Sequence, residues 1–167
     1  MSTVSHKKDA PKSVRVAVIS VSSTRSLKED KSGAWIKKHA QKEGNEVVSH
    51  QVVDDDISDI RNLLLQEMET VAPDAVIITG GTGIGPKDVT IEAVKFLFHK
   101  ELSAFGPVFA QLSFEEIDSA AILSRATAGI IGKTLVFCLP GSLKACKMAC
   151  NNLIFPELGH LLKHIKE

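Results

Sequence analysis

A glycine-rich segment carries the residue types that could most directly do chemistry in this sequence. Residues 79–83 read Thr-Gly-Gly-Thr-Gly, after an apolar run over 75–79 and before a predicted helix. Glycine amides can approach an anion closely, and the start of a helix favours negative charge. The segment is not a Walker A loop, because Pro86 follows Gly85, and it lacks G-x-G-x-x-G. We expect an anion-binding loop, with a plain glycine turn as the alternative.

Carboxylates stand beside this loop and at the end of another predicted strand. Asp88 follows the glycine segment, where a bare carboxylate would repel phosphate unless it held a cation or took part in proton transfer. A Mg²⁺ ligand and a carboxylate at a helix N-terminus both fit this position. Asp54, Asp55 and Asp56 end a predicted strand at the edge where open α/β sheets bind ligands, but they can equally cap a helix.

Hydroxyl groups and cations recur in three further loops that we expect at the same edge. These loops are residues 20–25, 124–125 and 140–144, and the Gly-Ser pair at 141–142 repeats the pattern of glycine before a helix. Single cations are usually solvated surface residues, so the joint placement is what favours an anion site. The cations that could neutralise phosphate are Arg25, Lys87, Arg125 and Lys144.

The cysteines and the paired histidines fit a structural interpretation. Cys138, Cys146 and Cys150 are odd in number and form no C-x-x-C pair, which argues against a disulfide framework and a structural zinc site. Cys146 and Cys150 fall in a helical segment with other apolar residues, so we expect them in the core. His160 and His164 share the i, i+4 spacing but lack H-E-x-x-H, and we assign them no ligand role.

Charge and hydropathy exclude several classes of partner. Twenty Lys plus Arg residues balance twenty Asp plus Glu residues, giving a formal net charge of +0. No overall field attracts a polyanion, which argues against nucleic acid and anionic membranes. No apolar run approaches the ~20 residues that cross a bilayer, and residues 1–13 lack a signal-peptide core. We expect a disordered tail over 1–13 and one domain over 14–167, in a reducing cytoplasm.

The order of predicted elements indicates an α/β domain with three layers, in which helices flank a mostly parallel, Rossmann-like sheet. The link over 131–134 is only hairpin-sized, which allows one antiparallel or bulged connection. We predict strands at 14–21, 46–53, 75–79, 126–132 and 134–139. We predict helices at 30–44, from 57 to a stop at Pro73, at 90–98, at 106–117 and from 142 to the end.

Four segments together closely resemble the MoaB/MogA family of molybdenum cofactor biosynthesis proteins. They are residues 79–93, 101–117, 124–130 and 139–142, in the family's order and spacing, and the resemblance covers residues 14–160. It implies an α/β fold around a mostly parallel sheet, assembly into trimers or hexamers, and binding of molybdopterin. Active members adenylylate molybdopterin with MgATP, so the resemblance implies ATP and Mg²⁺ as well.

The resemblance also assigns residues. The pterin-phosphate loop falls on Gly80, Gly81, Thr82 and Gly83, and ligand contacts fall on Ser20, Ser22, Ser113, Gly141 and Ser142. The family's catalytic aspartate falls on Asp88, and its second aspartate falls on Asp55 or slips by one to Asp54 or Asp56. Ile91 and Leu143 stand where the family frequently has proline. These two departures lie beside the expected site and bear on its fine specificity.

The implied reaction is adenylyl transfer, in which the terminal phosphate of molybdopterin attacks the α-phosphorus of ATP and pyrophosphate leaves. Asp88 and Asp55 would hold Mg²⁺ or orient the attacking phosphate, and no covalent enzyme intermediate is needed. The alternatives are a carrier that binds molybdopterin without chemistry, and an interaction or scaffold domain of the same fold. The apolar segments 96–98 and 105–109 add to the expectation of a homo-oligomer.

Overall fold

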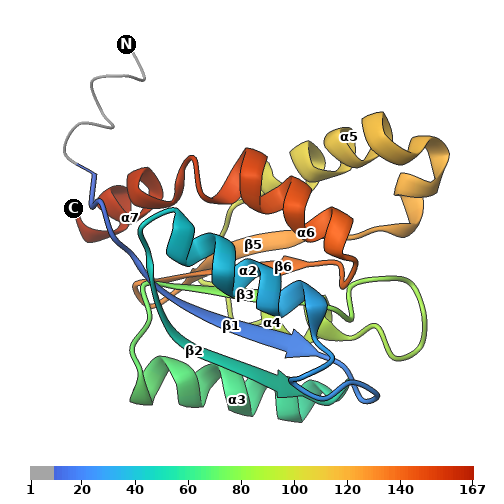
Figure 1. Ribbon diagram of the computed structural model, residues 1–167, viewed down its shortest axis with the longest axis horizontal. Coiled ribbons are helices and arrows are strands. Elements are labelled where there is room, and N and C mark those ends of the chain that lie inside the picture. The colour runs from blue at the N-terminus through green and yellow to red at the C-terminus, as the bar shows by residue number, and fades with distance from the viewer. Residues whose placement is uncertain (1–9) are drawn as a thin grey trace.

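A six-stranded sheet with helices on both faces forms the body of the protein in the computed structural model, which describes residues 10–167 (Figure 1). The strands are β1 (Arg15–Val21), β2 (Glu46–Val53), β3 (Ala75–Thr79), β4 (Lys100–Glu101), β5 (Thr127–Ile131) and β6 (Thr134–Leu139). The helices are α2 (Lys31–Lys42), α3 (Ile57–Thr70), α4 (Thr90–Lys95), α5 (Phe105–Ile117), α6 (Leu143–Ala149) and α7 (Leu158–Lys166). Most of the tail expected over residues 1–13 falls outside the described residues.

The sheet has the order β2-β1-β3-β6-β5-β4, and its first four strands run parallel. The pairs β5–β6 and β4–β5 are antiparallel. The β-α-β-α-β opening therefore gives the expected parallel sheet, and the short link between β5 and β6 gives the expected hairpin. Among the described residues no helix has both the length and the apolar character to cross a membrane.

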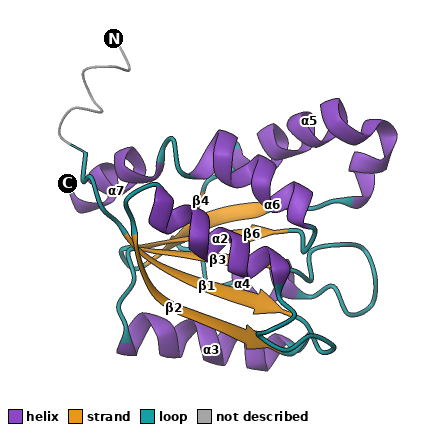
Figure 2. Ribbon diagram, in the orientation of Figure 1, coloured by secondary structure: helices purple, strands orange, loops and turns teal. Residues whose placement is uncertain are grey.

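Alternating side chains of the strands build two cores, so the domain has three layers (Figure 2). On β1, Val16 and Val18 belong to the core under α2, α5, α6 and α7, while Ala17 and Ile19 belong to the core under α3 and α4. Strands buried on both faces read as continuous apolar runs, which is the pattern of a parallel sheet covered by helices. The expected three-layer α/β fold is confirmed.

Short polar side chains begin α2 and α3, the helices that follow β1 and β2. The Asp30 carboxylate accepts a hydrogen bond from the Gly33 amide at the start of α2, and the Asp56 carboxylate accepts from Ser58 and Asp59 at the start of α3. These contacts satisfy amides that have no partner within the helix. Because the caps fix where each helix begins, they also fix the loops that lead from the strand ends.

Four details differ from the predicted elements, and the first is the 3₁₀ helix Asp118–Leu123, which was not predicted. The helix predicted over 90–98 ends at Lys95, and the helix predicted from 142 onward is divided by a π-helical turn, Cys150–Ile154, into α6 and α7. The two-residue strand β4 was not predicted, because Lys100 and Glu101 are both charged and form no apolar pattern. β4 forms through backbone pairing with Gly129 and Ile130 at the edge of the sheet.

Candidate functional site

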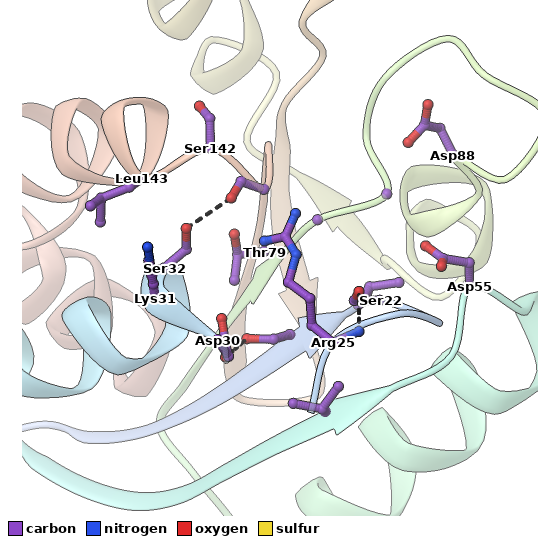
Figure 3. A pocket seen from close by; sticks show the side chains of 16 residues that line it. Ser22, Arg25, Asp30, Lys31, Ser32, Asp55, Thr79, Asp88, Ser142 and Leu143 are labelled. Carbon is purple, nitrogen blue, oxygen red and sulfur yellow. Dashed lines mark hydrogen bonds between the residues drawn. The ribbon is translucent and has the colours of Figure 1, made fainter. Parts of the chain in front are cut away.

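A cavity of about 530 Å³ lies where β1, β3 and β6 end (Figure 3). These parallel strands point their carboxyl ends to the same edge, the usual ligand side of an open α/β sheet. The cavity is lined by Ser20, Val21, Ser22, Arg25, Asp30, Lys31, Ser32, Val52, Asp55, Thr79, Gly80, Gly81, Asp88, Gly141, Ser142 and Leu143. The structure thus brings together most of the residues that the sequence analysis selected.

The glycine loop enters the cavity in a conformation that only glycine adopts easily. Gly80 has φ +99° and Gly81 has φ +66°. A Cβ atom on Gly80 would collide with the carbonyl oxygen of Val21, and one on Gly81 would collide with the Thr90 hydroxyl. Strain and space therefore both require glycine here. The segment is a close-packed loop between strand ends, which gives a ligand direct access to backbone.

Thr82 contributes a buried hydroxyl group that the protein leaves without a partner. Thr82 is 1% exposed, and within residues 10–167 its Oγ1 is the one buried side-chain nitrogen or oxygen that makes no hydrogen bond. Burying a polar group without a partner costs free energy. Thr82 and Gly83 do not line the cavity themselves, but they continue the loop directly from Gly81, which does. The loop therefore holds a buried hydroxyl group whose hydrogen-bonding capacity is unused among the described residues.

Arg125 holds the glycine loop in place. Its Nε donates to the carbonyl oxygens of Thr82 and Gly83, each at 3.0 Å, and its guanidinium pairs with the carboxylate of Glu92. The hydrogen bond to Glu92 raises the pKa of Arg125, and the same contact lowers the pKa of Glu92. Arg125 does not line the cavity. Arg125 therefore stabilises the loop from outside the cavity, whereas its charge alone suggested a contact with phosphate.

Asp88 lines the cavity and closes a turn in the loop. Its Oδ2 accepts a hydrogen bond of 2.8 Å from the Gly85 amide, while its own amide donates to the Gly85 carbonyl oxygen at 3.0 Å. The adjacent helix α4 has Val89 at its N-cap and no side-chain cap. The Asp88 side chain therefore makes no capping hydrogen bond to α4, although the residue stands directly before the N-cap of that helix. The carboxylate is positioned by the loop and lies at the cavity wall.

The three consecutive aspartates at the end of β2 separate into different environments. Asp55 lines the cavity and is fixed by Ser23, whose amide donates to Asp55 Oδ2 at 2.8 Å and whose Oγ accepts from the Asp55 amide at 3.0 Å. Asp56 caps α3, and Asp54 is exposed to solvent. The cap interpretation is thus confirmed for Asp56, while the ligand role of Asp55 stays a prediction. Asp55 is the member that faces the cavity.

The loop after β1 supplies a hydroxyl and a cation. Ser22 Oγ accepts hydrogen bonds from the amides of Thr24 and Arg25 at 3.3 and 3.2 Å, which folds the loop back over the strand end. The Arg25 side chain extends into the cavity from this loop (Figure 3). Lys87, by contrast, is exposed and does not line the cavity, and Lys144 pairs with Glu116. Of the four cations selected from the sequence, Arg25 is the one at the cavity wall.

Asp30 is a cavity residue that sequence reasoning treated only as the start of a helix. Its carboxylate accepts from the Ser20 hydroxyl, from His50 Nε2 at 2.8 Å and from the Gly33 amide at 2.9 Å. Burial would raise the pKa of Asp30, but the hydrogen bonds from His50, Ser20 and Gly33 outweigh it and lower the pKa. Because the Ser20 proton is engaged with Asp30, the Ser20 oxygen faces a ligand as an acceptor.

The loop after β6 completes the wall opposite Arg25. Gly141 packs closely on the glycine loop, since a Cβ atom there would lie 3.3 Å from the Gly80 Cα, and its carbonyl oxygen accepts from the Ser32 hydroxyl at 2.8 Å. Ser142 caps α6, with its Oγ accepting from the Ala145 amide at 3.2 Å. Ser113 is buried in α5 and does not line this cavity. A ligand contact at Ser113 stays a prediction.

The three thiols are packed in the core, as expected. Cys138, Cys146 and Cys150 are buried and free, and burial raises the pKa of each. Cys146 Sγ lies 3.1 Å from Thr79 Oγ1, beneath the cavity wall, and its pKa is raised to about 11. A protonated, buried thiol is a poor nucleophile and a poor metal ligand. These cysteines therefore have a structural role.

The donor set of the cavity suits a hard cation that is bound together with phosphate. The described residues include no group of three or more His, Cys, Asp or Glu side chains that could hold a metal ion. Asp55 and Asp88 are nevertheless two carboxylates on one cavity wall (Figure 3). Mg²⁺ is typically bound by one or two carboxylates plus substrate phosphates and water. The residues present fit Mg²⁺ on these terms.

Comparisons with known proteins agree with this geometry. A family profile described as a probable molybdopterin binding domain matches residues 17–160. The chain is 45% identical to molybdenum cofactor biosynthesis protein B of Bacillus subtilis over 168 residues, covering 100% of this chain and 99% of that protein. It is 44% identical over 173 residues to a protein of Pyrococcus furiosus named molybdopterin adenylyltransferase, covering 100% of both. A crystal structure of molybdenum cofactor biosynthesis protein B superposes with a TM-score of 0.90 at 42% identity, covering 94% of this chain and 98% of that chain.

Proposed function

Because the chain belongs to the MoaB/MogA family of molybdenum cofactor biosynthesis proteins, we propose that it transfers the adenylyl group of ATP to molybdopterin. A terminal phosphate oxygen of molybdopterin attacks the α-phosphorus of ATP, the bond from that phosphorus to the bridging oxygen breaks, and pyrophosphate leaves. One observation carries the proposal: a glycine loop at positive φ meets the carboxylates of Asp55 and Asp88 and the guanidinium of Arg25 in one cavity.

The glycine loop would seat the phosphate of molybdopterin. Gly80 and Gly81 put backbone at the cavity wall, and Thr82 follows directly in the loop without lining the wall itself, so a ligand contact at Thr82 stays a prediction. Gly83 continues the loop, and its carbonyl oxygen is held by Arg125. A loop held in advance binds an anion without an ordering cost, which is why preorganised amides stabilise charge effectively.

Asp55 and Asp88 are the residues that would hold Mg²⁺. Each carboxylate has one oxygen fixed by a backbone amide and a second oxygen with no hydrogen bond of its own. Mg²⁺, when bound, would neutralise the phosphate charge that the carboxylates would otherwise repel. The carboxylates would orient the reacting phosphates, and Arg25 adds a positive charge to the same cavity.

The remaining wall would recognise the organic parts of the ligands. Ser20 faces the cavity as an acceptor, because its proton is engaged with Asp30, and it suits an N–H or O–H group of a substrate. Ser22, Gly141 and Ser142 line the same space and add hydroxyl and backbone groups. Leu143 also lines the cavity, at a position where the family frequently has proline, and would tune the fit.

We propose further that residues 14–167 act as one unit in a cytoplasmic homo-oligomer, a trimer or a hexamer. Three free thiols agree with a reducing compartment. Large apolar side chains are exposed on α5 and on the 3₁₀ helix Asp118–Leu123, including Phe114 at 57% and Ile122 at 83% exposure. Such clustered apolar exposure marks association surfaces.

Incubation of the purified protein with molybdopterin, ATP and Mg²⁺ tests the proposal. We expect release of pyrophosphate together with adenylylated molybdopterin. Omission of either substrate should abolish the signal, which excludes simple ATP hydrolysis. Tight molybdopterin binding without any pyrophosphate release would contradict the transfer activity and would identify a carrier instead.

A further inference from the structure

Helix α7 carries a second cluster of chemically active side chains, at the end of the molecule opposite the cavity (Figure 1). His160 and His164 lie one turn apart, and their Nε2 atoms face each other at 3.0 Å. Buried Leu158 and Leu162 anchor the same helix to the core. The backbone that presents the two rings is therefore fixed by packing.

Each ring also has a carboxylate at its other nitrogen. His160 Nδ1 lies 3.1 Å from Glu157 Oε2, and His164 Nδ1 lies 3.5 Å from Glu167 Oε2. The four side chains form a row of three contacts, from carboxylate to ring, ring to ring, and ring to carboxylate. Carboxylates only accept hydrogen bonds, so both rings are expected to hold their proton on Nδ1.

Each neutral imidazole carries one N–H proton, so two protons have to serve three contacts. If both protons point to the carboxylates, the two Nε2 lone pairs face each other at 3.0 Å. If His164 instead holds its proton on Nε2 and donates to His160, its Nδ1 lone pair faces the Glu167 carboxylate at 3.5 Å. A positive ion between the Nε2 atoms resolves the conflict. Carboxylates that orient the second nitrogen of ligating histidines are the usual outer partners of a metal site.

We propose that His160 and His164 form a binding site for a first-row divalent cation that prefers imidazole, with water completing the coordination. At the usual metal–nitrogen distance of about 2.0–2.1 Å, a separation of 3.0 Å gives an N–metal–N angle of roughly 95°. This angle is close to that of tetragonal and octahedral ions such as Ni²⁺ and Cu²⁺. The side chain of His164 is 58% exposed, which leaves room for water ligands.

Calorimetry with Ni²⁺ on untagged, full-length protein tests the site. We expect one Ni²⁺ per chain, with affinity lowered about tenfold or more in His160→Ala and in His164→Ala. His39→Ala is the matched control, because His39 is a helical histidine with a carboxylate neighbour, Glu43, at 3.6 Å but no imidazole one turn away. Its affinity should equal that of the wild type. Mg²⁺ should not compete, since it prefers oxygen ligands.

A second measurement needs no variant. Paramagnetic Ni²⁺ should broaden the NMR signals of the His160 and His164 rings before those of any other histidine. Unchanged affinity in either alanine variant, or broadening that spares these two rings, would overturn the proposal and leave a proton shared between the imidazoles. Neither readout depends on molybdopterin or ATP, so the result stands apart from the proposed adenylyl transfer.

Discussion

The Arg125 side chain is hydrogen-bonded to the Thr82 backbone, because its Nε donates to the Thr82 carbonyl oxygen at 3.0 Å. The contact couples the start of β5 to the glycine loop, although the two segments are distant in sequence. Thr82 also holds the buried hydroxyl, and within residues 10–167 this side chain adds no hydrogen bond to the contact made by the backbone. The position of the glycine loop therefore depends on a residue outside the cavity.

Replacing Arg125 by Lys should loosen this loop. Lysine cannot reproduce the planar set of donors that reaches Thr82, Gly83 and Glu92, so we expect a loss of about 1–2 kcal/mol of stability. The KM for molybdopterin should rise more than kcat falls. Lys144→Ala is the control, because it removes an exposed cation, paired with Glu116, without touching the loop. Equal KM values in the two variants would refute the role of Arg125 in stabilising the glycine loop.

Asp88→Asn should separate binding from chemistry. The amide oxygen of asparagine can still accept from the Gly85 amide, so the turn should persist while the charge is lost. We expect pyrophosphate release to fall by about a hundredfold or more, with molybdopterin binding equal or slightly tighter. Asp54→Asn, at an exposed neighbour of Asp55, should leave turnover unchanged. Near-normal turnover in folded Asp88→Asn would remove the catalytic role of Asp88.

The Asp30 network should make stability sensitive to acid. The pKa of Asp30 is lowered in the folded protein from its ordinary value of 3.8, so the unfolded chain takes up the proton more readily. The stabilisation is therefore present above about pH 4 and is lost as the pH falls through the folded-state pKa. Asp30→Asn should cost about 1–3 kcal/mol at neutral pH. Its unfolding free energy should depend less on pH between 2 and 5, where Asp74 and Glu92 supply the remaining slope.

Chemical denaturation at several pH values measures this effect. His50→Ala removes one donor to the same carboxylate and should reduce the acid slope in part. A slope unchanged in Asp30→Asn would show that the network does not hold the carboxylate ionised.

The thiols should resist alkylation until the protein unfolds. Cys146 is buried with a pKa raised to about 11, and Cys138 and Cys150 are buried as well. Iodoacetamide at pH 8 should label them only in denaturant, as followed by mass spectrometry. Replacing Cys146 and Cys150 together by Ala should lower stability by about 1 kcal/mol or more per site and leave transfer largely intact in the folded fraction. Loss of activity in a folded variant would contradict the structural role.

The exposed apolar side chains of α5 and its 3₁₀ extension should mediate assembly. Light scattering should give the mass of a trimer or a hexamer, and Phe114→Glu combined with Ile122→Glu should shift it toward one chain. Leu65→Glu, on α3 with a side chain 45% exposed, is the control and should leave the mass unchanged. A single-chain mass for the wild type at micromolar concentration would refute the oligomer.

The parts of this structure that follow from local pattern could be predicted from the sequence. β1, β3 and β6 are continuous apolar runs, and Asp56 and Ser142 are typical caps, so the layers and the cavity edge could be predicted. β4 could not, because its two charged residues are held only by pairing with β5. Nor could the π-helical turn, which lies within an otherwise regular helical pattern.

The candidate site also contains residues that could be predicted from the sequence and residues that could not. Gly80 and Asp88 have sequence neighbours that suggest a ligand. The place of Asp30 at the cavity depends instead on a hydrogen bond with His50, which lies in β2. Asp55 faces the cavity while Asp56 caps α3, and this difference depends on Ser23, a residue of the loop after β1 that is hydrogen-bonded to Asp55. The charge of Arg125 suggested phosphate, but its partners are carbonyl oxygens that only the folded loop brings to it. Long-range partners are the information that a single sequence lacks.

The central position of β6 also determines when a newly synthesised chain can finish folding. β1, β2 and β3 are complete by Thr79, yet β3 lacks a partner on one edge until Leu139 has left the ribosome. An unpaired parallel edge can pair with other chains, so the nascent protein is exposed to aggregation during that interval. The Gly80 amide also pairs with the Leu139 carbonyl oxygen, at 2.9 Å. The ligand cavity is therefore among the last features to form during translation, and substrate cannot protect the chain before then.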